Sequence, residues 1–143
     1  MTNDTYRHKG LRRQLVSLLK TKGISNENVL KAIEKSPRHL FLDNAFIERA
    51  YEDIAFPIGA GQTISRPHTV AFQTELLELK KGEKVLEVGT GSGYQTSILM
   101  EMGVKVFSIE RQKELFDKTK KLLPEIGDAP KPFYGAGYKG IPI

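Results

Sequence analysis

Three glycines alternate with other residues directly after a short apolar run, and this pattern is typical of a ligand-binding turn. Gly89, Gly91 and Gly93 follow the run at 85–88, and a helical pattern begins at Tyr94. Glycine tolerates positive φ and lets a ligand approach the backbone closely. A glycine turn between a strand and a helix also leaves free N–H groups at the helix start. The segment therefore predicts a site for an anion or a nucleotide.

The spacing of the glycines narrows the choice of ligand. A dinucleotide site has the pattern G-x-G-x-x-G, whereas this chain has G-x-G-x-G, with Tyr94 in the place of the third glycine. No Lys-Ser or Lys-Thr pair follows the turn, which excludes the phosphate-binding loop of ATP and GTP sites. Glu87 stands just before the first glycine, where its charge would repel a pyrophosphate and attract an ammonium group.

A second acid, Glu110, ends the next apolar run at 104–109. It follows the glycine turn by about twenty residues, which is the place of a ribose-binding acid at the end of a second strand. These features suit a ribonucleoside that carries an amino group and no phosphates, and S-adenosylmethionine fits that description. Glu110 has a second interpretation, because acids also cap helix N-termini, and the two roles can coexist.

Two segments carry a family resemblance. Residues 87–93, Glu-Val-Gly-Thr-Gly-Ser-Gly, look like motif I of class I S-adenosylmethionine-dependent methyltransferases. Residues 62–68, Gln-Thr-Ile-Ser-Arg-Pro-His, resemble a signature of protein-L-isoaspartate O-methyltransferases. Shorter stretches fit the same family, at 38–41, 51–53, 57–59 and 106–111. The resemblance covers essentially the whole chain.

The resemblance implies a cofactor site and a reaction centre. It places Ser65 at the reaction centre as the catalytic residue, and Tyr51 and Asp53 in substrate binding. The cofactor-binding residues that it implies are Thr63, Ile64, Ser65, His68, Glu87, Val88, Gly89, Thr90, Gly91, Gly93 and Glu110. These roles have alternatives. His68 is also compatible with a surface position in a first helical turn, and Tyr51 and Asp53 with purely structural roles.

The reaction implied by the resemblance is methyl transfer from S-adenosylmethionine to the free carboxyl of an L-isoaspartyl residue in a damaged protein, which initiates repair. Proteins or peptides with isoaspartyl residues are then the partners. A carboxylate is already ionised at neutral pH and needs no strong base. Proximity and orientation then supply most of the rate, in agreement with a sequence that has no cysteine and no paired-carboxylate pattern.

The elements that position these residues predict an α/β fold. Apolar spacing predicts helices at about 6–22, 25–37, 67–79, 94–102 and 112–123, with Val70, Phe72, Leu76 and Leu77 as the buried face of the third. Ser25 is the expected cap of the second helix, and Pro124 the end of the last. Strands are predicted near 85–88, 104–109 and 131–134, and 53–65 as a loop-like crossing.

We therefore expect the N-terminal part of a Rossmann-like class I methyltransferase sheet, with about three parallel strands. Residues 1–143 form a single partial domain, in which 1–52 are a helical layer and 53–143 the first half of the cofactor-binding sheet. Val85, Leu86 and Val88 have the composition of a strand that is covered on both faces.

Two departures from the family pattern bear on activity. The turn after the third strand usually reads Gly-Asp-Gly in the family, with the acid beside the adenine, whereas this chain has Gly135-Ala136-Gly137. The chain also stops at Ile143, before further strands of a class I sheet, which leaves the first strand at the sheet edge. We expect a C-terminally truncated chain. The alternative functions are a non-catalytic cofactor-binding remnant and a class I methyltransferase with another substrate, a small molecule or RNA.

Composition excludes several other classes. The net charge of +5 comes from 22 basic and 17 acidic residues that are spread along the chain, so we expect no nucleic-acid partner. The absence of cysteine excludes disulfides and cysteine–zinc sites, and three scattered histidines predict no metal. The polar N-terminus and the lack of a long apolar run predict a cytoplasmic protein without a membrane partner.

Overall fold

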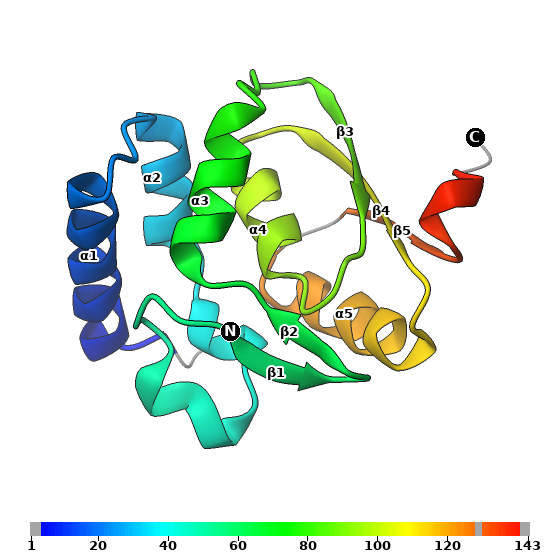
Figure 1. Ribbon diagram of the computed structural model, residues 1–143, viewed down its shortest axis with the longest axis horizontal. Coiled ribbons are helices and arrows are strands. Elements are labelled where there is room, and N and C mark those ends of the chain that lie inside the picture. Colours follow the sequence, from blue (N-terminus) through cyan, green and yellow to red (C-terminus); the bar gives the residue numbers. More distant parts are fainter. Residues whose placement is uncertain (1–3, 128–129, 141–143) are drawn as a thin grey trace.

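The computed structural model describes residues 4–127 and 130–140 (Figure 1). A helical layer comes first, followed by a hairpin and then an α/β unit. The layer consists of α1 (Tyr6–Thr21), α2 (Glu27–Lys35) and the 3-10 helices η1 (Arg38–Phe41) and η2 (Asn44–Arg49). The hairpin is β1 (Phe56–Gly59) and β2 (Gln62–Ile64). The α/β unit comprises α3 (Pro67–Leu76), β3 (Lys84–Val88), α4 (Tyr94–Glu101), β4 (Lys105–Glu110), α5 (Lys113–Glu125), β5 (Lys131–Tyr134) and η3 (Gly137–Lys139).

The three strands of the α/β unit are parallel in the order β3-β4-β5, as the sequence predicted. Val85 pairs with Val106 and Glu87 with Ser108, so these side chains share one face of the sheet. Leu99 of α4 packs on that face with Val106 and Val85. The face toward α4 is therefore the buried one.

The opposite face of β3 is open. Leu86 is 52% exposed and Val88 64% exposed, so the prediction that this strand is covered on both faces is wrong for the described residues. Side chains alternate along a strand, and α4 packs on only one of the two faces. β3 also forms the edge of the described sheet, as expected.

The segment predicted to be a loop-like crossing contains the hairpin β1–β2. Phe56 pairs with Ile64 and Pro57 with Thr63 in an antiparallel ladder. Ala60 and Gly61, between the strands, have φ of +52° and +70°. Two residues with positive φ make the tight turn that suits the twist of a hairpin. The sequence did not predict β1, because Pro57 and the glycines are typical of loops and the alternation of the buried Phe56 and Ile58 is short.

Three further boundaries or faces differ from the prediction. Asn26, not Ser25, caps α2, because its side chain accepts the N–H groups of Asn28 and Val29 at 3.0 and 3.2 Å. Pro124 lies inside the last turn of α5 instead of ending it. On α3, Val70 is buried as predicted, but Phe72, Leu76 and Leu77 are 49%, 65% and 55% exposed.

No helix among residues 4–127 and 130–140 has the length and apolar character that crossing a bilayer requires.

Candidate functional site

The glycine turn has the backbone that its sequence predicts. Gly89, Gly91 and Gly93 have φ of +90°, +57° and +89°, a region that side chains rarely allow. A Cβ at Gly93 would lie 3.3 Å from both Leu123 and Thr119, so this glycine also lets α5 pack closely. No heavy atom of the described residues lies within 4 Å of a Cβ built at Gly89. The backbone at Gly89 is therefore open to a ligand.

Glu110 is held by two backbone amides. Its Oε1 accepts the N–H of Gly91 and its Oε2 the N–H of Gln112, each at 2.8 Å. The carboxylate is 4% exposed. It therefore fastens the end of β4 to the glycine turn and to the start of α5, and the expected capping role is present. Ribose binding by Glu110 stays a prediction.

Glu87 projects from β3 into the interior between the sheet and α4. Its Oε1 accepts hydrogen bonds from the hydroxyls of Ser108, at 2.7 Å, and of Thr96. Burial raises the pKa of Glu87 to about 7, against the lowering effect of those hydroxyls, and the nearby Glu110 adds to the rise. A cation that approached this carboxyl would favour its ionised form.

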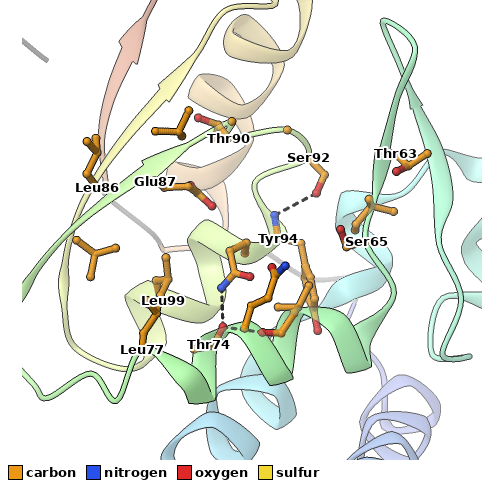
Figure 2. Close-up of a pocket in the computed structure, with 18 residues that line it drawn as sticks. Thr63, Ser65, Thr74, Leu77, Leu86, Glu87, Thr90, Ser92, Tyr94 and Leu99 are labelled. Atoms are coloured by element: carbon orange, nitrogen blue, oxygen red, sulfur yellow. Dashed lines mark hydrogen bonds between the residues drawn. The ribbon is translucent and has the colours of Figure 1, made fainter. Parts of the chain in front are cut away.

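A pocket of about 300 Å³ opens between the glycine turn, α3 and the end of the hairpin (Figure 2). Thr63 and Ser65 lie on one side of it, and Glu87, Thr90 and Ser92 lie across from them. Apolar side chains also line it, including Val70, Leu77 and Leu99. The pocket thus combines apolar and polar side chains, as small-molecule sites do.

Eight of the eleven residues predicted to bind the cofactor line this pocket. They are Thr63, Ile64, Ser65, Glu87, Val88, Gly89, Thr90 and Gly91. His68, Gly93 and Glu110 do not line it, although Gly93 and Glu110 shape the turn that does. The N–H of His68 donates to Asp53 at 2.8 Å, and its ring stacks on Phe72.

Ser65 lies directly before α3. Arg66 is the cap position of that helix and Pro67 its first residue, in agreement with the predicted helix at about 67–79. The Ser65 side chain is exposed and borders the pocket. No hydrogen bond of its hydroxyl is formed within the described residues, so the group is available to a ligand. The structure thus places the predicted catalytic residue across the pocket from the glycine turn.

Tyr51 and Asp53 do not line the pocket. The Tyr51 hydroxyl contacts Arg12 and His39 at 2.8 and 2.7 Å, inside the helical layer, and burial raises the pKa of Tyr51 to about 12. Asp53 accepts the N–H of His68 at 2.8 Å and pairs with Lys22. Burial alone would raise the pKa of Asp53, but Lys22 and the His68 amide hold it below its usual value. Their substrate-binding roles stay predictions.

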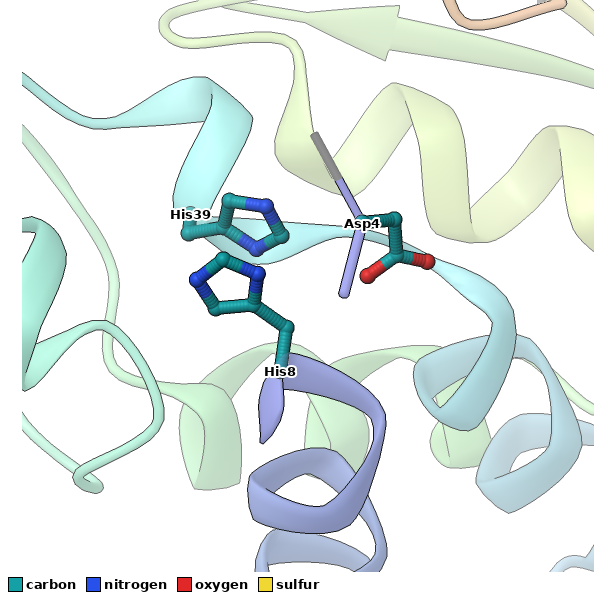
Figure 3. A group of neighbouring side chains, drawn as sticks. All are labelled: Asp4, His8 and His39. Atoms are coloured by element: carbon teal, nitrogen blue, oxygen red, sulfur yellow. The ribbon is translucent and has the colours of Figure 1, made fainter. Parts of the chain in front are cut away.

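Asp4 and His8 are brought together with His39, which is distant from them in sequence (Figure 3). One ligand-type atom of each lies within 4.8 Å of the others. The Asp4 carboxylate pairs with Arg12 at 2.7 and 2.8 Å, and Nδ1 of His8 accepts the N–H of Thr5 at 3.2 Å. The two imidazole rings stack with centroids 3.7 Å apart. These contacts fasten the start of α1 to η1.

Sequence reasoning did not single out Ser108 and Thr96, whose hydroxyls donate to Glu87. Ser108 pairs with Glu87 across the parallel ladder, and Thr96 lies in the first turn of α4, where its hydroxyl donates to Glu87. Thr90 completes the group through its hydrogen bond to Ser108 at 2.5 Å. Strand register, once known, would have identified Ser108, because paired residues point to the same face.

Comparisons with known proteins agree with this geometry. The family model described as protein-L-isoaspartate(D-aspartate) O-methyltransferase (PCMT) matches residues 10–141. The chain is 64% identical over 140 residues to a protein-L-isoaspartate O-methyltransferase of Flavobacterium psychrophilum, and 61% identical over 138 residues to one of Cytophaga hutchinsonii. Those matches cover 97% and 96% of this chain, and 66% and 62% of the relatives.

Solved structures give the same result. A protein-L-isoaspartate O-methyltransferase superposes with a TM-score of 0.80 at 30% identity, over 92% of this chain and 44% of that protein. A Plasmodium falciparum protein of the same description, in complex with S-adenosyl-L-homocysteine, superposes with a TM-score of 0.69 at 27% identity, over 87% of this chain and 62% of that protein. The chain thus spans less than two thirds of the length of these proteins.

Proposed function

The chain belongs to the protein-L-isoaspartate(D-aspartate) O-methyltransferase family, and from this premise we propose that it binds S-adenosylmethionine and takes part in methylation of isoaspartyl carboxyls in damaged proteins. The observation that carries the proposal is the pocket of about 300 Å³ that has Ser65 on one side and the glycine turn on the other. The complex of the Plasmodium falciparum relative with S-adenosyl-L-homocysteine supports the choice of cofactor.

The residues present fit this cofactor. The open backbone at Gly89 admits close approach of a ligand, and a nucleoside needs such an approach at a glycine turn. Glu87 offers a buried carboxyl with no basic partner among the described residues, which suits a ligand with a positive charge. Glu110 would hold the turn in shape and could accept ribose hydroxyls at the lone pairs that its amide partners leave.

The bound cofactor would supply an activated methyl group on a sulfonium. A substrate carboxylate would take this methyl group, and the electron pair of the carbon–sulfur bond would stay on sulfur. Ser65 would donate a hydrogen bond to that carboxylate and so orient it. The buried apolar side chains of Val70 and Leu99 would limit water along their part of the pocket wall. The chain would therefore contribute the orientation of the reacting groups and the exclusion of water, and no strong acid or base.

A pair of peptides tests the reaction. One carries an L-isoaspartyl residue and the other an aspartyl residue at the same position. Radiolabelled methyl transfer to the isoaspartyl peptide alone is the expected result. Equal methylation of both peptides, or of a small molecule or RNA in their place, would show a methyltransferase with another substrate.

A second function is favoured by one observation. Ala136 stands in the turn after β5, where an acid would lie beside the adenine in the family pattern, so one polar contact to the cofactor is missing. Loss of a charged hydrogen bond costs at most about 3 kcal/mol, or two orders of magnitude in affinity. A chain that binds S-adenosylhomocysteine weakly and transfers no methyl group to either peptide would be this cofactor-binding, non-catalytic form.

The cytoplasmic location expected from the sequence belongs to the proposal as well. A chain without cysteine is compatible with a reducing compartment. Fractionation of cells with an antibody to the chain tests the location directly.

A further inference from the structure

Arg38 is the largest side chain that the described fold buries completely, with an exposed fraction of 0%. It lies at the start of η1 in the helical layer and does not line the pocket. A buried guanidinium costs much free energy unless its N–H groups are satisfied, and those of Arg38 are satisfied except at Nη1, which has no hydrogen-bond partner among the described residues. The partners of Arg38 therefore indicate what the residue does.

The guanidinium donates to three backbone carbonyls from separate segments. Nε donates to the carbonyl of Ala50 at 2.9 Å. Nη2 donates to the carbonyls of Ile54 and Ser65, each at 3.1 Å. The planar fork of an arginine reaches several acceptors at fixed angles, which a lysine ammonium cannot do. Arg38 thus ties the end of η2 and the approach to β1 directly to Ser65.

The same guanidinium lies over an aromatic ring of the helix that follows the glycine turn. Its carbon is 4.8 Å from the ring centroid of Tyr94, the first residue of α4 after the glycine turn. Tyr94 is 1% exposed and lines the pocket. Arg38 is therefore in contact with two elements that border the pocket, the Ser65 segment and the helix that follows Gly93.

We propose that Arg38 is a positioning residue that fixes Ser65 relative to the glycine turn. The significance for catalysis rests on the proposed function, because there Ser65 orients the substrate carboxylate. An error of about 1 Å in such a group can cost a hundredfold in rate. The structural part of the proposal stands independently of the reaction.

Arg12 provides a matched control within the same layer. It is also buried, at 3% exposure, and also donates to a backbone carbonyl, that of Glu34 at 2.6 Å. Its other partners are Asp4 and Tyr51, and it does not line the pocket. Arg12→Lys therefore removes a comparable buried guanidinium without touching Ser65.

Amide hydrogen exchange of the full chain, without ligand, tests the positioning. Arg38→Lys is expected to speed exchange of residues 62–70 by about tenfold or more, because local opening there loses its anchor. Arg12→Lys is expected to change exchange in α1 and α2 and to leave residues 62–70 within about twofold of the parent chain. Unchanged exchange at 62–70 in Arg38→Lys, or an equal effect of Arg12→Lys there, overturns the proposal.

A functional measurement separates this proposal from the function on which it rests. Where the parent chain methylates the isoaspartyl peptide, Arg38→Lys is expected to lower kcat by about tenfold or more and to leave KM for the peptide nearly unchanged. Loss through general unfolding would appear equally in Arg12→Lys. Where the parent chain transfers no methyl group, the proposed function fails, and the exchange result alone decides the role of Arg38.

A second variant covers the case in which Arg38→Lys does not fold, as judged by circular dichroism. Tyr94→Leu removes the ring under the guanidinium and keeps the three carbonyl contacts of Arg38. Faster exchange at 62–70 is expected, whereas exchange equal to that of the parent chain overturns the proposal. Tyr94→Phe is its control, because it keeps the ring.

Discussion

The backbone N–H of Gly91 donates to Oε1 of Glu110 at 2.8 Å, which joins the glycine turn after β3 to the end of β4. The other carboxylate oxygen of Glu110 accepts the N–H of Gln112 at the start of α5. A single buried side chain thus sets the position of the turn and of the next helix. The shape of the pocket wall depends on both oxygens being acceptors.

Glu110→Gln tests that dependence. The new amide NH₂ would face either the Gly91 or the Gln112 N–H, and two donors cannot pair. We expect the free energy of unfolding to fall by about 1.5–3 kcal/mol and the affinity for S-adenosylhomocysteine to fall about tenfold. Denaturant unfolding and calorimetry measure the two effects. Glu125→Gln, an exposed change near the end of α5, is the control. Equal stability of the two variants would contradict the assigned role.

Glu87 makes stability depend on pH in a definite direction. Burial raises its pKa from the ordinary 4.5 to about 7, so the folded state holds this proton where the unfolded state has lost it. The stabilising contribution is complete below pH 4.5 and is lost as the pH rises through 7. The difference amounts to about 3 kcal/mol.

Urea unfolding at pH 5 and pH 8, with Glu87→Gln beside the parent chain, measures this term. The parent chain is expected to lose more stability than the variant between the two pH values, because the substituted amide side chain does not titrate. Other acids, such as Asp53, contribute equally to both chains and cancel in the difference. Identical pH profiles of the two chains would show that Glu87 is ionised in the folded state at pH 5.

Ser65→Ala separates orientation of the substrate from binding of the cofactor. The hydroxyl is proposed to hold a carboxylate, so turnover of the isoaspartyl peptide is expected to fall by about tenfold to a hundredfold. The dissociation constant of S-adenosylhomocysteine is expected to stay within about threefold of the parent value. Ser17→Ala, on the exposed side of α1, is the control. Parallel losses of turnover and cofactor binding would refute the orienting role.

Self-association is predicted at β3, because this strand lies at the edge of the described sheet and its side chains Leu86 and Val88 are exposed. An apolar strand at a sheet edge is a template for pairing with another chain. Leu86→Lys is expected to reduce association at high concentration and to change the free energy of unfolding by less than about 0.5 kcal/mol, because the side chain is already half exposed. Sedimentation velocity measures the association. Leu76→Lys, a similar exposed change on α3, should have little effect; an equal effect of both would point to general surface hydrophobicity.

Local chemistry was sufficient to predict the central part of the fold. The apolar runs, the three glycines and Pro67 predicted β3, the turn, α4 and the start of α3, because each of these depends on residues close in sequence. The predicted ends of two helices, near residues 22 and 102, lie next to Gly23 and Gly103, which have positive φ. The third strand at Lys131–Tyr134 and the turn beyond it followed from the same kind of signal.

Contacts between distant segments could not be predicted in this way. The exposed Leu86 and Val88 have the sequence of a buried strand, and only the sheet order and the packing of α4 decide which face is covered. Phe72 of α3 and Leu77 directly after it were predicted to be buried but are exposed, for the same reason. The contacts of Arg38 with Ser65 and Tyr94 join residues far apart in the chain, so no local pattern revealed them.

Calorimetric titration of the purified chain with S-adenosylhomocysteine tests whether the pocket between Ser65 and the glycine turn is a cofactor site. We expect saturable one-to-one binding with a micromolar dissociation constant, because the glycine turn, Glu87 and the Ser65 segment already form one pocket in this chain. The absence of binding heat at millimolar ligand, from a chain that is folded by circular dichroism, would contradict a cofactor site in this pocket.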